Sequence, residues 1–206
     1  MRRIEVKNNN DNSFIGAWNI NDDKLMDEFV EFFNSNPEIQ SSGKLIGGKI
    51  DRNIKDSIDI AIEPKMIAKD EKYKIFKVFF DKLIQCYMDY QKQYDTLERF
   101  HEINLGTFNL RKYLIGGHFK KMHFERTGLS TSHRLFAWMV YLNDLPGGGG
   151  ETEFQYFDVK IKPEKGKIII WPAEWTHLHC GQPTKKEDKY IMTGWFHFPD
   201  SEDYNK

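Results

Sequence analysis

Two segments that lie far apart in the sequence carry the residues best suited to bind a metal ion. His123 and Glu125 are separated by one residue, and in a β-strand such residues point to the same face, so an imidazole and a carboxylate would converge. A histidine from the second segment, Thr176 to Pro183, would complete a set of two imidazoles and one carboxylate. That set holds Fe(II) on one side and leaves coordination positions free for other ligands, although zinc can use it too.

The second segment offers two candidates for the distant ligand. His177 and His179 would share a face on a regular strand, so the residues alone leave both open. The other histidines after residue 100, among them His118, His133 and His197, are expected at strand ends, at the rim or in structural roles.

Lys189 begins a predicted strand in which it shares one face with Ile191, Thr193, Trp195 and His197. A cation on a mostly apolar inner face needs an anionic partner. The far carboxylate of a dicarboxylic acid held on the metal would serve as that partner. The alternative is an ordinary solvated lysine at the edge of a sheet.

The elements that must position these residues follow from the spacing of the apolar side chains. Apolar residues recur every three or four positions over residues 24–33 and 69–94, which predicts two amphipathic helices. After Glu98 the sequence changes to short β-rich runs separated by turn residues, as an antiparallel sandwich or barrel requires. The predicted strands cover residues 106–113, 117–125, 135–142, 151–157, 167–171, 176–180 and 190–198.

Three glycine-rich or polar segments are expected outside this regular structure. Residues 1–13 are polar and Asn-rich, which indicates a frayed terminus or a loosely attached edge segment. Residues 41–51 suit a turn beside an edge strand. Residues 147–150 are four glycines, and no Gly-Lys-Ser/Thr follows them, so they indicate a flexible turn and not a phosphate-binding loop.

Composition narrows the class of protein. The 206 residues suffice for one domain with a sizeable core, since 39% are hydrophobic and 15% aromatic. The formal charge is −1 with both signs mixed along the chain, which argues against binding of nucleic acid or of a membrane surface. Cys86 and Cys180 are too few and too far apart for a disulfide framework, and no apolar run forms a signal core or a membrane span. A cytoplasmic location is therefore expected.

A longer series of residues follows the pattern of a known family. The chain resembles the 2-oxoglutarate and Fe(II)-dependent oxygenases of the prolyl 4-hydroxylase type, and is most similar to their short phage-encoded or bacterial members. Two positions depart from the family pattern: Glu125 stands where Asp is usual, and Phe119 lies one residue farther from His123. The matching residues, in order, are Tyr113, Gly116, Gly117, Phe119, His123, Glu125, Gly149, Gly150, Thr152, Phe154, His179, Pro183, Lys189 and Trp195.

The resemblance covers residues 100–198 by motif and residues 14–95 more loosely. It implies an α+β, mainly β fold: a double-stranded β-helix, also called a jelly roll and cupin-like, with buttressing helices before it. Residues 1–13 would be a flexible N-terminus, and residues 14–206 a single oxygenase domain with helical support at 14–97 and the jelly-roll core at 98–198.

The resemblance also assigns roles to side chains. His123, Glu125 and His179 are the implied catalytic residues and Fe(II) ligands, because the intervals to the following proline and lysine favour His179 over His177. Lys189 would pair with the distal carboxylate of 2-oxoglutarate, and a tyrosine hydroxyl would add a hydrogen bond. The residues implied around the cosubstrate are Lys189, Tyr113, Thr193 and Trp195.

The implied activity is that of a dioxygenase that hydroxylates an organic substrate with O2 and releases succinate and CO2. Ascorbate is the expected reductant of the iron. A peptidyl proline is the substrate that the family suggests, while free amino acids and other small molecules stay open. The location would be the host cytoplasm if the protein is viral, and the motifs indicate no oligomeric state.

Two other classes of protein compete with this interpretation. A non-catalytic, cupin-like protein that binds a metal or a ligand is the main alternative, since a fold does not settle a function. An acid–base hydrolase is a weaker alternative, because no nucleophile elbow is present. Lys189 and Trp195 discriminate between the oxygenase and the cupin-like protein, since a structural zinc site has no use for a buried cation near its open face.

Overall fold

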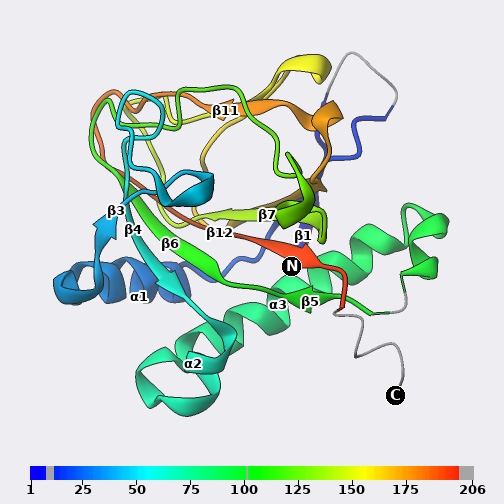
Figure 1. The fold of residues 1–206 in the computed structure, drawn as a ribbon, viewed down its shortest axis with the longest axis horizontal. Coiled ribbons are helices and arrows are strands. Elements are labelled where there is room, and N and C mark those ends of the chain that lie inside the picture. The colour runs from blue at the N-terminus through cyan, green and yellow to red at the C-terminus, as the bar shows by residue number, and fades with distance from the viewer. Residues whose placement is uncertain (8–11, 101, 200–206) are drawn as a thin grey trace.

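Two antiparallel sheets dominate residues 1–7, 12–100 and 102–199, the part of the chain that the computed structural model describes (Figure 1). Within these residues the larger sheet has nine strands in the order β1-β2-β10-β7-β12-β6-β4-β3, with β5 also paired to β12, and the smaller has the order β11-β8-β9. The strands are β1 Arg2–Ile4, β2 Gly16–Asn19, β3 Ser41–Ser42, β4 Ile58–Ile62, β5 Asn104–Leu105, β6 Phe108–Tyr113, β7 Arg134–Tyr141, β8 Thr152–Phe154, β9 Val159–Ile161, β10 Lys167–Pro172, β11 His179–Gly181 and β12 Lys189–His197.

Three α-helices cover one face of the larger sheet, on the side opposite to β11 (Figure 1). They are α1 Asp23–Asn34, α2 Pro64–Lys69 and α3 Ile75–Gln91. The helix predicted at 24–33 is confirmed, and its start is fixed by Asp22, whose carboxylate accepts a hydrogen bond from the Leu25 amide at 3.2 Å. The helix predicted at 69–94 is confirmed over residues 75–91, the bounds of α3, but its predicted start is too early. Asp70 adopts an extended conformation and caps a new turn, so α2 ends there and α3 begins later.

Short 3-10 turns connect these elements. They are η1 Pro37–Ile39, η2 Ile46–Gly48, η3 Glu71–Tyr73, η4 Asp95–Arg99, η5 Leu129–Thr131, η6 Gln155–Phe157 and η7 Trp175–His177.

The two faces of the larger sheet bury two separate hydrophobic clusters. Along β12, Tyr190, Met192 and Phe196 pack toward the helices, whereas Ile191 packs into the interior of the jelly roll. This is the period-two alternation expected of a strand that is covered on both faces. The interior cluster is the smaller of the two and leaves one end of the jelly roll open as a cavity. The fold class predicted from the sequence is confirmed.

Three of the predicted strands are wrong in part. The segment 117–125 is irregular and makes only isolated bridges, one between Lys55 and Phe119 and one between His123 and His179. The strand predicted at 151–157 ends at Phe154. The strand predicted at 176–180 starts only at His179, because a 3-10 turn occupies the residues before it.

The N-terminal segment forms an edge strand where it is described. β1 pairs with β2, and residues 8–11 lie outside the described part of the chain. The predicted turn at 147–150 is confirmed, with left-handed φ values at Gly148, Gly149 and Gly150 that only glycine adopts without strain.

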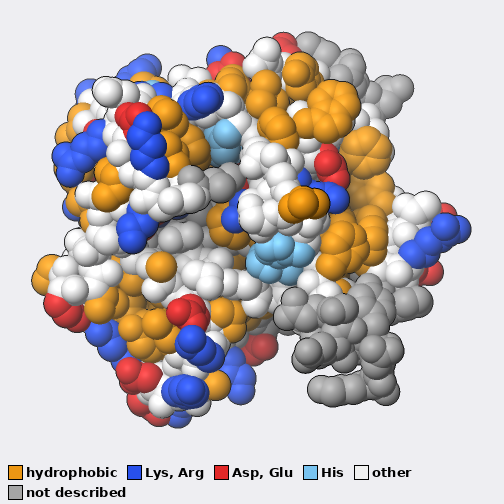
Figure 2. Space-filling view, viewed as in Figure 1, with side chains coloured by type: hydrophobic (Ala, Val, Ile, Leu, Met, Phe, Trp, Pro, Cys, Tyr) orange, Lys and Arg blue, Asp and Glu red, His pale blue; other side chains and the backbone are white. Residues whose placement is uncertain are grey.

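The surface carries mixed charges. On the face drawn in Figure 2, Lys and Arg side chains alternate with Asp and Glu, and histidine side chains lie between hydrophobic ones. None of the helices in the described residues is both long enough and apolar enough to cross a membrane.

Candidate active site

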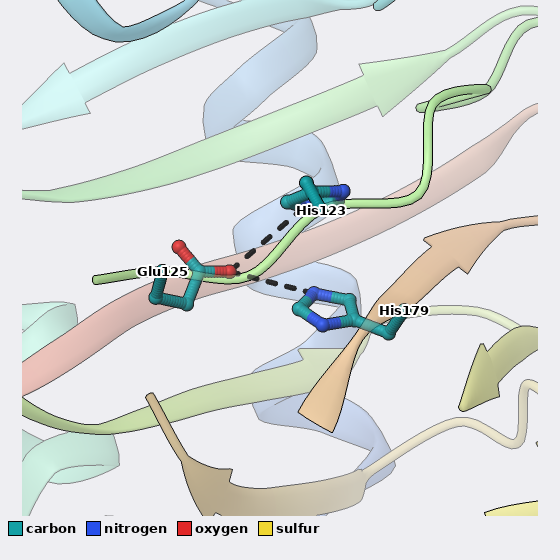
Figure 3. A group of neighbouring side chains, drawn as sticks. All are labelled: His123, Glu125 and His179. Carbon is teal, nitrogen blue, oxygen red and sulfur yellow. Dashed lines mark ion pairs between the residues drawn. The ribbon is translucent and has the colours of Figure 1, made fainter. Parts of the chain in front are cut away.

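Three side chains meet inside the cavity at the open end of the jelly roll (Figure 3). One carboxylate oxygen of Glu125, Oε1, lies 3.8 Å from Nε2 of His123 and 3.4 Å from Nε2 of His179. The potential ligand atoms of the three residues all lie within 4.8 Å of one another. The cavity has a volume of about 680 Å³, within the range of small-molecule pockets.

The irregular segment 117–125 brings His123 and Glu125 to this point. The backbone amides and carbonyls of His123 and His179 exchange two hydrogen bonds of 2.9 Å, which places the two histidines side by side. The amide of Glu125 donates to the carbonyl of Ala173 at 3.2 Å. The convergence of His123 and Glu125 was predicted correctly, but it comes from these bonds and not from a regular strand.

Further hydrogen bonds fix the first half of the same segment. The Lys120 amide donates to the carbonyl of Ile54, in the turn before β4, at 2.8 Å, and the Gly181 amide of β11 donates to the Phe119 carbonyl at 3.0 Å. The ring of Phe119 stacks on the imidazole of His123 with 3.7 Å between ring centroids. The segment is therefore held by backbone hydrogen bonds at Phe119 and Lys120 as well as at His123 and Glu125, and its aromatic residue supports the first histidine.

Backbone carbonyls fix the tautomers of both histidines. Nδ1 of His123 lies 2.9 Å from the carbonyl oxygen of Lys121, and Nδ1 of His179 lies 2.8 Å from that of His177. A carbonyl oxygen only accepts hydrogen bonds, so Nδ1 must carry the proton in each ring. The Nε2 lone pairs then face the cavity, which is the arrangement that histidine ligands of metals show.

The second oxygen of Glu125 is held by its own partners. The indole nitrogen of Trp195 donates to Oε2 at 2.9 Å, and Nη1 of Arg134 lies 3.6 Å from the same oxygen. The Arg134 guanidinium also stacks 3.7 Å from the centroid of the Trp195 ring. Trp195 lines the cavity as the resemblance implies, but its polar atom contacts the carboxylate.

Burial and charge set the protonation states of the cluster. Burial lowers the pKa of His123 to about 3, so this imidazole is neutral at pH 7. Burial alone would raise the pKa of Glu125, but the adjacent His179 and His123 imidazoles and the hydrogen bond from Trp195 hold it at about 2. A neutral imidazole and an ionised carboxylate are the forms that bind metals.

His177 does not share the face of His179. It lies in the 3-10 turn η7, where the alternation of a strand does not apply, and its Nε2 lies 3.0 Å from the carbonyl oxygen of Ser13. Burial lowers its pKa to about 4. Of the two histidines that the residues left open, only His179 joins the cluster in the cavity.

Lys189 is buried, with 4% of its surface exposed, and lies on the cavity wall. Its ammonium donates to the Gly150 carbonyl at 2.6 Å and lies 5.7 Å from the ring centroid of Tyr113 and 5.1 Å from that of Tyr141. Burial lowers the pKa of Lys189 to about 7. The alternative of a solvated edge lysine is wrong.

Tyr113 and Thr193 line the same cavity. The residues that the resemblance implies around the cosubstrate, which also include Lys189 and Trp195, therefore share one wall. The hydroxyl of Thr193 donates to the Trp138 carbonyl at 2.9 Å.

Sequence reasoning missed several charged residues of the cavity. Arg111 and Asp59 lie on β6 and β4 and form a buried ion pair, Lys55 joins them, and Arg134 approaches Glu125. The available signal was a charged residue at an inward-facing position of an otherwise alternating strand, as Arg111 is two residues before Tyr113. The partners of such residues follow only from the order of the strands.

The donor set of the cluster fits Fe(II). Two imidazole nitrogens and one carboxylate lie on one side of a cavity that stays open, which is the pattern of non-haem Fe(II) sites. Among the described residues no further His, Cys, Asp or Glu joins the group, so the set is not the closed four-ligand shell of a structural zinc.

Comparisons with known sequences agree with this chemistry. Residues 108–197 match the model of the 2OG-Fe(II) oxygenase superfamily, which confirms the resemblance over that part of the chain. A probable prolyl 4-hydroxylase 9 of Arabidopsis thaliana is 26% identical over 123 residues, which cover 47% of this chain and 42% of that protein. Prolyl 4-hydroxylase subunit alpha-1 of Homo sapiens is 25% identical over 76 residues, covering 34% of this chain and 14% of the subunit. The chain thus spans less than half the length of either relative.

Solved structures share the fold over most of the chain. The viral collagen prolyl hydroxylase of Paramecium Bursaria Chlorella virus-1, in its 2OG complex, has a TM-score of 0.66 at 20% identity, and the match covers 92% of this chain and 98% of that one. A prolyl hydroxylase of Trichoplax adhaerens, in complex with a hypoxia inducible factor peptide fragment, has a TM-score of 0.68 at 15% identity, covering 89% and 83%. At these identities the likeness concerns the fold alone.

Proposed function

We propose that the protein is a 2-oxoglutarate- and Fe(II)-dependent dioxygenase that hydroxylates an organic substrate and releases succinate and CO2. The observation that carries this proposal is the open set of His123, Glu125 and His179 in the same cavity as the buried Lys189. The superfamily match over residues 108–197 supports it.

Each side chain of the site has a task in this proposal. His123, Glu125 and His179 would hold Fe(II), and Lys189 would neutralise the distal carboxylate of 2-oxoglutarate. The bound metal and cosubstrate would supply the activation of dioxygen. Trp195 keeps the carboxylate of Glu125 oriented, and the apolar wall of the cavity excludes water from the reaction.

A peptide is the substrate that the comparisons support best, with a peptidyl proline as its reacting residue. The Trichoplax adhaerens neighbour was solved with a peptide fragment, and the curated relatives carry prolyl 4-hydroxylase names. Use of ascorbate, a viral source, a cytoplasmic location and the organisation of residues 14–206 as one domain stay predictions of the same proposal.

Ligand binding without turnover tests the proposal. Protein mixed with Fe(II) and 2-oxoglutarate under anaerobic conditions should develop a weak visible charge-transfer band. His179→Ala and Glu125→Ala should abolish the band, and Lys189→Ala should weaken 2-oxoglutarate far more than Fe(II). The matched control is His177→Ala, which removes a buried histidine two positions from a proposed ligand and should keep the band.

Turnover then separates an enzyme from the cupin-like alternative. Succinate release is measured while proline-containing peptides, free amino acids and other small molecules are offered one at a time. Release that depends on a peptide supports the prolyl hydroxylase-like activity. A protein that binds Fe(II) but not 2-oxoglutarate would support the non-catalytic alternative.

A further inference from the structure

A buried charged network lies in the cavity wall beside the proposed cosubstrate site. Both oxygens of the Asp59 carboxylate accept from Arg111, through Nε at 2.8 Å and Nη2 at 2.9 Å. Lys55 donates to Oδ2 of Asp59 at 2.8 Å, and Ser57 donates to Oδ1 at 2.8 Å. All four residues are buried. None of them has a task in the function proposed above.

The pairing of the strands connects this network to Lys189. Asp59 on β4 lies opposite Arg111 on β6, and Tyr113, two residues further on the same face of β6, lies opposite Lys189 on β12. Cζ of Arg111 lies 6.0 Å from the centroid of the Tyr113 ring, and Nζ of Lys189 lies 5.7 Å from it. Tyr113 therefore stands between a guanidinium and an ammonium, and all these residues line the cavity.

The Arg111 guanidinium is oriented by its bidentate contact. Two of its nitrogens are used by Asp59, and that planar fork cannot rotate without breaking both bonds. Lys55 and Ser57 hold the carboxylate from the other side. Burial raises the pKa of the Tyr113 hydroxyl, and Arg111 opposes this rise by its charge and by hydrogen bonding. The guanidinium lies on the same face of β6 as Tyr113, with Cζ 6.0 Å from the centroid of the tyrosine ring.

A guanidinium beside a tyrosine can only donate to its hydroxyl, which leaves the hydroxyl its own proton to donate elsewhere. Arginine has no acceptor atom, so the Tyr113 proton must point away from Arg111. The other cation near the Tyr113 ring, the ammonium of Lys189, cannot accept it either. An anionic oxygen between Tyr113 and Lys189 would take both donors.

We propose that Arg111 and Asp59 are positioning residues that make Tyr113 a donor to the distal carboxylate of 2-oxoglutarate, which Tyr113 and Lys189 then bind together. This inference rests on the proposed function. It adds that the cosubstrate is recognised by a chain of contacts that runs from β4 through β6 to the ligand.

The experiment is a double-mutant cycle read by calorimetric titration of 2-oxoglutarate into the Fe(II)-loaded protein without oxygen. Its four proteins are the wild type, Tyr113→Phe, Arg111→Gln and the double variant. Each single variant should bind 2-oxoglutarate roughly 10- to 100-fold more weakly, as expected for a lost hydrogen bond to a charged group. The double variant should be no weaker than Tyr113→Phe, because Arg111 acts through the hydroxyl.

Two controls separate positioning from general damage. Binding of 2-oxopentanoate, which lacks the distal carboxylate, should be the same in all four proteins. Lys112→Gln removes a cation from the same strand outside the cavity, where Lys112 pairs with Asp188 at 2.9 Å, and should leave 2-oxoglutarate binding unchanged. If Arg111→Gln does not fold, the cycle is run with Asp59→Asn and Arg111→Gln together, which removes both charges of the pair.

The outcomes distinguish this inference from the proposed function. The positioning role is overturned if Arg111→Gln weakens 2-oxoglutarate binding by the same factor in the wild type and in Tyr113→Phe. It is also overturned if Arg111→Gln weakens 2-oxopentanoate binding as much as 2-oxoglutarate binding. Rescue by Arg111→Lys would also overturn it, because a lysine restores the charge without the fork. If the wild type does not bind 2-oxoglutarate, or if Lys189→Ala has no effect, the proposed function and this inference both fail.

Discussion

Replacing Lys189 with methionine should stabilise the ligand-free protein while it weakens 2-oxoglutarate. The ammonium is buried on the cavity wall, and burial lowers its pKa to about 7, against a usual value of about 10.4 in an unfolded chain. The charged form of Lys189 therefore lowers the unfolding free energy of the ligand-free protein, and an anionic ligand bound beside it would offset this loss. Methionine has a similar length and carries no such cost.

The size of the effect follows from the two pKa values of Lys189. A difference of about 3.4 pKa units means that the buried ammonium destabilises the native state by about 5 kcal/mol. This destabilisation is present below pH 7, where Lys189 is charged in both the native and the unfolded state. Between pH 7 and about 10.4 the unfolded chain binds a proton that the native state does not, so the unfolding free energy rises with pH. The methionine leaves the Gly150 carbonyl without its donor, at a cost of about 1–3 kcal/mol. A net gain of about 2–4 kcal/mol is expected near neutral pH.

Urea unfolding of the metal-free protein at pH 6.5 and pH 9.5 measures this effect. The wild type should gain stability between the two pH values relative to Lys189→Met. The matched control is Lys186→Met, at an exposed lysine just before the same strand, which should change neither the stability nor its pH dependence. A Lys189→Met variant that is less stable at pH 6.5, or that keeps the wild-type pH dependence, would refute the reasoning.

Three further substitutions have expected outcomes. Trp195→Phe removes the donor to Oε2 of Glu125 and should weaken Fe(II) binding about 10-fold or more in an anaerobic metal titration. Glu125→Asp restores the more usual residue of the family, yet it should also weaken Fe(II), because the shorter side chain withdraws the oxygen that now lies 3.4 Å from His179; equal or tighter binding would contradict this. His177→Gln should lower the unfolding free energy by about 1–3 kcal/mol in urea but leave the Fe(II) titration unchanged, since His177 bonds to Ser13 and not to the cluster.

The parts of the fold that could be predicted are those set by a local period. Five of the six apolar residues at 24–33 are buried in α1, and the face of β12 that carries Lys189 lines the cavity as the alternation requires. In both cases the side-chain pattern of a regular element decides which face is buried. The ends of the helices are harder to predict than the helices themselves. Asp70 ends α2 and caps the next turn, and the apolar pattern does not reveal such a local cap.

The charged pair of Asp59 and Arg111 could not be predicted, for a physical reason. Each residue alone reads as an ordinary charged side chain on an alternating strand. Their contact depends on β4 and β6 being neighbours, and that pairing joins segments that the sequence separates by α2 and α3. Long-range strand pairing therefore carries information that local periodicity does not.

The two departures from the family pattern lie in one irregular segment, and the structure relates them to each other. In a regular strand Phe119 and His123, four residues apart, would point to the same face, whereas the usual spacing of three would place them on opposite faces. The segment is not a regular strand: it is held by hydrogen bonds to His179 and Gly181 in the smaller sheet and to Ile54 and Ala173 outside the strands, and Phe119 stacks on His123. The longer side chain of Glu125 then reaches the same point as His179, and Trp195 fixes its free oxygen. The extra residue and the extra methylene are therefore both accommodated in the segment that carries the proposed ligands, which is why the cluster forms despite them.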